Sequence, residues 1–149
     1  MPELKVGNKA PDFIAQTTDG KLGLNDYRGK NLVLYFYVRD HTLGCTMQSC
    51  SLRDRINEIK AQNAEVLGVS VDDLESHRRF KEKEKLNFPL VADVDFSISK
   101  LFGAFNEKRQ ISRRMTFVID KDGIIRYILS RVDVRGHAKE VVEVLQKMK

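Results

Sequence analysis

Two cysteines, Cys45 and Cys50, are the only thiols of the chain and lie five positions apart in the stretch RDHTLGCTMQSCSLRD. A deprotonated thiol is a nucleophile, and a second thiol within reach can close a disulfide with it after oxidation. Free cysteine is also among the most buried residue types, so the pair could equally be two small core residues without chemistry. The C-x4-C spacing alone leaves both interpretations open.

The position of Cys45 favours chemistry. An apolar run, LVLYFYV, ends shortly before it and a helical pattern follows, which places Cys45 near the start of a helix. Unpaired backbone N–H groups and the positive end of the helix dipole would stabilise a thiolate there. Thr42 could hydrogen-bond the thiolate or a small oxygen substrate, and Gly44 allows the backbone to approach closely. Arg39 and Arg114 are the candidate cations for this end of the sheet.

Cys50 can react with Cys45 only after a change of shape. Five residues along one helix give a rise of about 7.5 Å and a Cα separation of about 8–9 Å. A disulfide requires a Cα separation of roughly 4.4–6.8 Å. The spacing therefore predicts a folded state with a reactive thiolate and a locally unwound state with a disulfide. In the second state, a sulfenic acid on Cys45 would have condensed with the Cys50 thiol.

Other polar residues give weaker signals. A metal site at the cysteines is disfavoured, because His41 adds one possible ligand and no fourth ligand follows at a recognisable spacing. The missing C-x-x-C motif argues against a general disulfide reductase. His41 could still influence the site, whereas His77, His137 and Arg113 are expected to be solvated.

Periodicity predicts the elements that must position these residues. Continuous apolar runs predict strands, apolar residues at offsets of three and four predict helices, and DKDG between two apolar runs predicts a hairpin. The expected elements are an N-terminal strand pair around TDGKLGL, strands at 31–38 and 64–72, an extended connection at 88–93, a hairpin within 115–132, and helices at 46–61, 73–86, 97–105 and from 138 to the C-terminus. This order predicts an α/β thioredoxin-like fold, with a mixed central sheet, helices on both faces and an added N-terminal β-hairpin.

Length and composition indicate one globular domain covering residues 1–149, since 149 residues with 42% hydrophobic and 32% charged side chains can bury a core. The net charge of +5 is spread over mixed Lys–Glu segments, which is weak evidence for a nucleic-acid partner.

The N-terminus shows no apolar signal region, and the longest apolar run, 32–38, is too short to span a membrane. We therefore expect a cytoplasmic protein without a membrane partner, where a permanent structural disulfide is unusual.

The segment LVLYFYVRDHTLGCTMQSCSLRD, with APDF upstream and RMTFVIDKDG downstream, resembles the peroxiredoxins, most closely the bacterioferritin comigratory protein or peroxiredoxin Q subgroup. The resemblance extends from about Val6 to the C-terminal helix. It implies a thiol-dependent peroxidase that reduces hydrogen peroxide and small organic hydroperoxides, with Cys45 as the peroxidatic cysteine. Cys50 matches the cysteine that resolves the oxidised form through an intramolecular disulfide. Thr42 matches the threonine that positions thiolate and peroxide, and Arg114 matches the arginine that stabilises the thiolate and the charge that develops in the reaction.

The resemblance implies no metal, haem or flavin, and it implies a thioredoxin-like or glutaredoxin-like protein as reductant. Three positions depart from the family pattern: Val38 and Leu43 stand at prolines, and Gln48 stands at a usual glutamate. These departures support an alternative, a non-enzymatic redox sensor or chaperone on the same fold. A basic nucleic-acid binder is a third and weaker hypothesis. We expect a monomer or a weak dimer.

Overall fold

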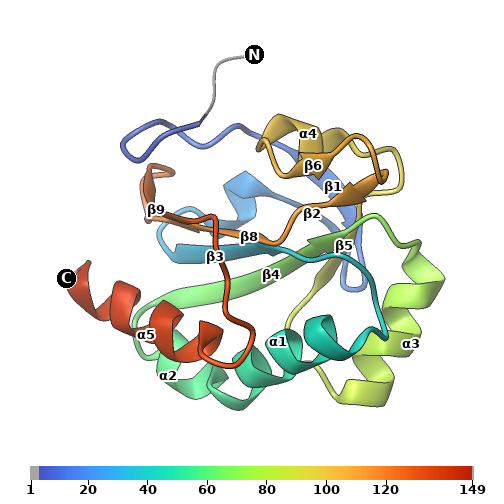
Figure 1. Cartoon of the computed structure of the whole chain (residues 1–149). Coiled ribbons are helices and arrows are strands. Elements are labelled where there is room, and N and C mark those ends of the chain that lie inside the picture. Colours follow the sequence, from blue (N-terminus) through green and yellow to red (C-terminus); the bar gives the residue numbers. More distant parts are fainter. Residues whose placement is uncertain (1–3, 149) are drawn as a thin grey trace.

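The computed structural model describes residues 4–148, and its centre is a seven-stranded mixed sheet (Figure 1). The strand order across the sheet is β2-β1-β5-β4-β3-β8-β9. β3, β4 and β5 run parallel, and the other neighbouring strands pair antiparallel. The strands are β1 (Ile14–Thr17), β2 (Gly20–Gly23), β3 (Asn31–Phe36), β4 (Ala64–Ser70), β5 (Leu90–Ala92), β8 (Met115–Ile119) and β9 (Ile125–Leu129).

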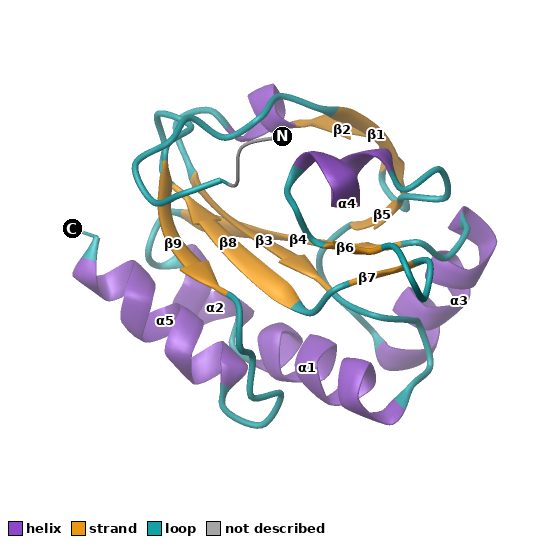
Figure 2. Cartoon of the chain, turned by 45° about the horizontal axis from the view of Figure 1, so that its top comes forward, coloured by secondary structure: helices purple, strands orange, loops and turns teal. Residues whose placement is uncertain are grey.

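Helices cover both faces of this sheet (Figure 2). One face packs against α1 (Leu43–Asp54), α2 (Ile56–Lys60), α3 (Leu74–Glu84) and α5 (His137–Lys147) around a large buried apolar cluster. The other face packs against the N-terminal segment, a 3-10 helix (Leu24–Tyr27) and α4 (Ser97–Leu101) around a second cluster. Two short strands, β6 (Phe105–Asn106) and β7 (Ile111–Ser112), form a separate pair.

The register of the central strands determines which loops meet. β3 is buried along nearly its whole length because β4 and β8 flank it, which explains its continuous apolar sequence. Phe36, the last residue of β3, pairs with Met115, the first residue of β8. Arg114, just before β8, therefore lies at the same edge of the sheet as the loop from β3 to α1.

The predicted architecture is confirmed: a mixed sheet, helices on both faces, and an N-terminal hairpin formed by β1 and β2. The helix expected at 46–61 is two helices, because the backbone at Arg55 (φ −106°, ψ 16°) leaves the helical conformation. The buried stripe of Leu52, Ile56 and Ile59 continues across the break, which is why periodicity did not reveal it. Across residues 4–148, no helix combines the length and apolar composition that crossing a bilayer requires.

Candidate active site

Cys45 lies in the first turn of α1, with its side chain fully buried. Thr42 is the N-cap residue, in an extended conformation (φ −83°, ψ 150°), and its carbonyl accepts the first helical hydrogen bond from Thr46 at 2.9 Å. The sulfur packs in the apolar cluster that also contains Tyr35 and Tyr37 of the β3 segment. The predicted position at a helix start is therefore confirmed, and the helix begins three residues earlier than expected.

Arg114 contacts the sulfur directly. Its Nη2 donates to Cys45 Sγ at 3.2 Å, and its Nη1 donates to Gln48 Oε1 at 2.6 Å. A Cβ atom on Gly44 would lie 3.4 Å from the same Nη2, at the limit of ordinary van der Waals contact, so the guanidinium packs closely against the Gly44 backbone. One cation thus joins the thiol to a neighbouring side chain on α1, and its charge and hydrogen bonds would stabilise a thiolate.

Thr42 and Arg39 belong to the loop that leads into α1, and neither forms a hydrogen bond with the sulfur. The Thr42 hydroxyl donates to the Arg39 carbonyl oxygen at 2.9 Å, and both side chains are exposed. Of the two candidate cations, Arg114 is the one that reaches Cys45. His41 and Arg113 are also exposed, and the His41 ring packs on Phe80 with a centroid separation of 5.3 Å.

Cys50 lies further along the same continuous helix, half-buried, and both cysteines are free thiols. Its Sγ donates to Glu84 Oε1, at the end of α3, over 3.6 Å. Burial, followed by the negative charge of Glu84, raises the pKa of the Cys50 thiol, while Arg53 opposes the shift. Cys50 is therefore held as a protonated thiol.

The three departures from the family pattern have different surroundings. Val38 is partly buried and packs against the cluster that contains Cys45. Leu43 is 78% exposed at the start of α1, whereas Gln48 is fully buried. Only Gln48 bonds the arginine that touches the sulfur.

His137 is the main residue that sequence reasoning missed, since it was expected in solvent and is 1% exposed. Gln48 Nε2 lies 3.4 Å from His137 Nδ1, and Thr116 Oγ1 lies 2.8 Å from His137 Nε2. Burial first, and then the charge of Arg114, lowers the pKa of His137 to about 4. The sequence did contain a signal that His137 is buried. His137 precedes Val141 by four positions and so shares the apolar face of its helix.

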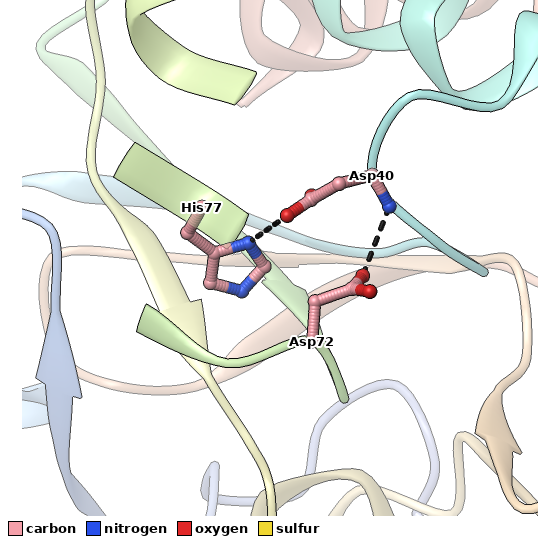
Figure 3. Close-up of side chains that lie close together, drawn as sticks. All are labelled: Asp40, Asp72 and His77. Atoms are coloured by element: carbon pink, nitrogen blue, oxygen red, sulfur yellow. Dashed lines mark hydrogen bonds and ion pairs between the residues drawn. The ribbon is translucent and has the colours of Figure 1, made fainter. Parts of the chain in front are cut away.

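His77 was also expected in solvent and is also buried, in a polar cluster with Asp40 and Asp72 (Figure 3). Its Nδ1 lies 2.7 Å from Asp40 Oδ2, and its Nε2 lies 2.8 Å from the Val91 carbonyl oxygen. Asp72 Oδ2 accepts a hydrogen bond from the Asp40 backbone N–H at 2.9 Å. The cluster ties the loop before α1 to α3 and to β5.

These three side chains could in principle ligate a metal, but the His77 ring and the Asp40 carboxylate already bond each other, and Asp72 Oδ2 accepts from the Asp40 backbone N–H and the Ser70 hydroxyl. Burial alone would raise the pKa of Asp40, yet hydrogen bonds from His77, Tyr37 and Ser76, together with the His77 charge, lower it below its usual value. Both His77 nitrogens face acceptors, so with Asp40 ionised both carry hydrogen and neither can bind a cation. The cluster is a structural ion pair.

Comparison with known proteins agrees with this geometry. The family model described as AhpC/TSA family matches residues 6–128. Peroxiredoxin Bcp of Escherichia coli (strain K12) is 37% identical, with 99% of each chain covered. The crystal structure of a cysteine-to-serine mutant of PrxQ from Xylella fastidiosa superposes with a TM-score of 0.92 at 30% identity, covering 99% of each chain.

A bacterioferritin comigratory protein from Xanthomonas campestris, whose structures were solved to study alkyl peroxide reduction, gives a TM-score of 0.86 at 30% identity over 91% of each chain. The family match, the near-complete coverage and the buried cysteine at a helix start all agree. The chain therefore belongs to the AhpC/TSA family and is a thiol peroxidase of the Bcp or peroxiredoxin Q type.

Proposed function

We propose that Cys45 is the peroxidatic cysteine. Its thiolate attacks one oxygen of a peroxide, the O–O bond breaks, and the sulfur becomes a sulfenic acid. The other oxygen leaves with the bonding electron pair and takes up a proton, which gives water or an alcohol. The observation that carries this assignment is the 3.2 Å contact between Arg114 Nη2 and the buried sulfur.

Arg114 would act in two stages. Before the reaction its positive charge stabilises the thiolate, and in the transition state its fixed N–H groups stabilise the charge that develops on the leaving oxygen. Thr42 supplies the other polar group at the mouth of the site. Its hydroxyl hydrogen is used by the Arg39 carbonyl, so its oxygen lone pairs remain able to accept a hydrogen bond from a peroxide.

Cys50 would then resolve the sulfenic acid. Its sulfur attacks the Cys45 sulfur, an S–S bond forms, and the hydroxyl leaves as water. Both residues lie on the intact α1, so its first turns must unwind before the sulfurs meet. A thioredoxin-like or glutaredoxin-like dithiol protein then reduces the disulfide, and both thiols return to the folded state.

The substrates would be hydrogen peroxide and small organic hydroperoxides. The alkyl peroxide reduction studied in the Xanthomonas campestris relative supports the second class. We further propose that residues 1–149 work as one domain, as a cytoplasmic monomer or weak dimer. The sheet supports the single domain, because it joins strands from Ile14 to Leu129.

Mass spectrometry after one equivalent of hydrogen peroxide tests the assignments. We expect a Cys45–Cys50 bond within one chain in the unchanged protein, and a Cys45 sulfenic acid in the Cys50→Ser variant. Cys45→Ser should lower peroxide consumption with thioredoxin and its reductase by about 10³-fold or more, because the nucleophile is lost. Undiminished consumption by Cys45→Ser would refute the role of Cys45. Oxidation of the unchanged protein without turnover would favour a redox sensor.

A further inference from the structure

A chain of hydrogen bonds leads from the reactive sulfur to the buried imidazole of His137. It runs through the Arg114 guanidinium and the Gln48 amide, with contacts of 3.2, 2.6 and 3.4 Å. We propose that His137 is a positioning residue for the peroxidase reaction: it holds the Gln48 amide, and that amide holds the Arg114 guanidinium on the sulfur. The inference rests on the proposed roles of Cys45 and Arg114.

The hydrogen atoms in this series of hydrogen bonds can be assigned in only one way. A guanidinium only donates, so the Gln48 atom 2.6 Å from Arg114 is the amide oxygen. The amide nitrogen then faces His137 Nδ1, and since that nitrogen only donates, Nδ1 must be the unprotonated acceptor. The neutral ring carries its hydrogen on Nε2, which donates to Thr116 Oγ1 at 2.8 Å.

The surroundings keep the ring in this neutral form. His137 is 1% exposed, and burial together with the nearby Arg114 charge lowers its pKa to about 4. A protonated ring would turn an N–H toward the Gln48 NH2 group and add a second positive charge near Arg114. At neutral pH the acceptor is therefore present, and the three side chains form one connected unit.

The acceptor matters because Gln48 is fully buried. Without it, the amide NH2 would lack a partner, and an unpaired buried donor is costly enough to move the side chain. Arg114 bonds Gln48 through Nη1 and the sulfur through Nη2. If the Gln48 amide moves, the guanidinium loses one of these two contacts and shifts relative to the sulfur. Cys45 would then lose the fixed donor that its oxidation requires.

Two substitutions distinguish the effect of losing the hydrogen-bond acceptor from the effect of a smaller side chain. His137→Leu and His137→Asn introduce side chains with the same number of heavy atoms, but only asparagine has an oxygen that can accept from Gln48. Both are made in the Cys50→Ser protein, so that only the oxidation of Cys45 by hydrogen peroxide is measured. Lys139→Ala, at an exposed position on the same helix, is the control.

We expect His137→Leu to lower the second-order rate constant by about 10-fold, because a misplaced catalytic group is costly. His137→Asn should stay within about threefold of the parent, since the acceptor is kept. In a Gln48→Leu protein, His137→Leu should have little further effect, because the two residues act through one contact.

Equal rate constants for the Leu and Asn variants, whether both slow or both unchanged, would overturn the inference. A parent protein whose Cys45 does not react with peroxide would instead refute the proposed function. Nitrogen-15 spectra of the unchanged protein at pH 7 provide a test that does not depend on how the variants fold. They should show His137 with hydrogen on Nε2 only, and a protonated Nδ1 would also overturn the inference.

Discussion

At the scale of single residues, the two cysteines have opposite surroundings. Cys45 is buried against the positive guanidinium of Arg114, whereas the Cys50 thiol faces the Glu84 carboxylate. A positive neighbour favours a thiolate, and a negative neighbour together with burial favours the thiol. With the proposed roles, this arrangement would keep Cys50 from competing for peroxide and leave it available to condense with an oxidised Cys45.

Glu84→Gln tests this difference. Removing the negative charge should lower the pKa of Cys50 toward its ordinary value, since Glu84 raises it both through its charge and through its hydrogen bond. In a Cys45→Ser protein, alkylation of Cys50 by iodoacetamide at neutral pH should become severalfold faster. Glu82→Gln, at an exposed position in the same turn, is the matched control. An unchanged or slower alkylation rate in Glu84→Gln would mean that Glu84 does not set the reactivity of Cys50.

The sequence predicted part of this site and missed the rest for a physical reason. Cys45 could be placed from local pattern, because a helix start is visible within a few residues. Arg114 came from the family resemblance, and its contact with the sulfur depends on the pairing of β3 with β8. The contact between Gln48 and His137 joins positions 89 residues apart. Periodicity shows which face of a helix is buried but does not show what that face touches.

At the scale of elements, the loop before α1 is anchored at Asp40. The Asp40 carboxylate accepts from the Tyr37 hydroxyl at 2.6 Å, the Ser76 hydroxyl at 2.9 Å and His77 at 2.7 Å. Both side chains of the Asp40–His77 pair are essentially unexposed. This anchor holds in place the loop that leads into α1, the helix that carries Cys45.

His77→Leu should therefore destabilise the protein strongly. Removing one partner of a buried ion pair leaves the other charge without compensation, which costs about 3 kcal/mol or more. Arg79→Leu, on the same helix, breaks an exposed pair with Glu75 and should cost less than about 0.5 kcal/mol. Urea denaturation of both variants measures the two free energies of unfolding. Similar losses in the two variants would contradict the anchoring role of His77.

The elements themselves were largely predictable, and the exceptions were short. The buried strands β3 and β4 follow from continuous apolar runs, and α3 (Leu74–Glu84) lies within the helix expected at 73–86. Asp73 is its N-cap residue, and the Asp73 side chain accepts from the Ser76 backbone N–H at 2.8 Å. β6 and β7 have two residues each, too few for any period to be visible. The helix expected at 97–105 already ends at Leu101, and its N-cap residue, Phe96, has a positive φ of 65°.

At the scale of the whole molecule, two apolar clusters share one sheet, and the active site belongs to the cluster on the α1 and α5 side. Both buried histidines come from helices that cover this face, but their polar neighbours differ. His77 is paired with a carboxylate, whereas His137 is surrounded by Arg114, the Gln48 amide, the Thr116 hydroxyl and the Tyr35 ring. The folded protein thus buries one neutral imidazole that an unfolded chain would protonate in weak acid.

This buried imidazole should make the protein less stable between about pH 6.5 and pH 4. Burial and the Arg114 charge lower the pKa of His137 from its ordinary value of 6.5 to about 4 in the folded protein, so in this range the unfolded chain binds more protons. The free energy of unfolding must then fall as the pH falls, by at most about 1.4 kcal/mol per pH unit. The lowered pKa of Asp40 adds its own loss from about pH 5 downward, where the unfolded carboxyl begins to bind protons, and this loss is common to the unchanged protein and to His137→Asn. Urea denaturation at several pH values measures how steeply the free energy of unfolding falls with pH. This slope should be smaller for His137→Asn than for the unchanged protein, because asparagine does not titrate. Equal slopes would contradict a neutral His137 in the folded state.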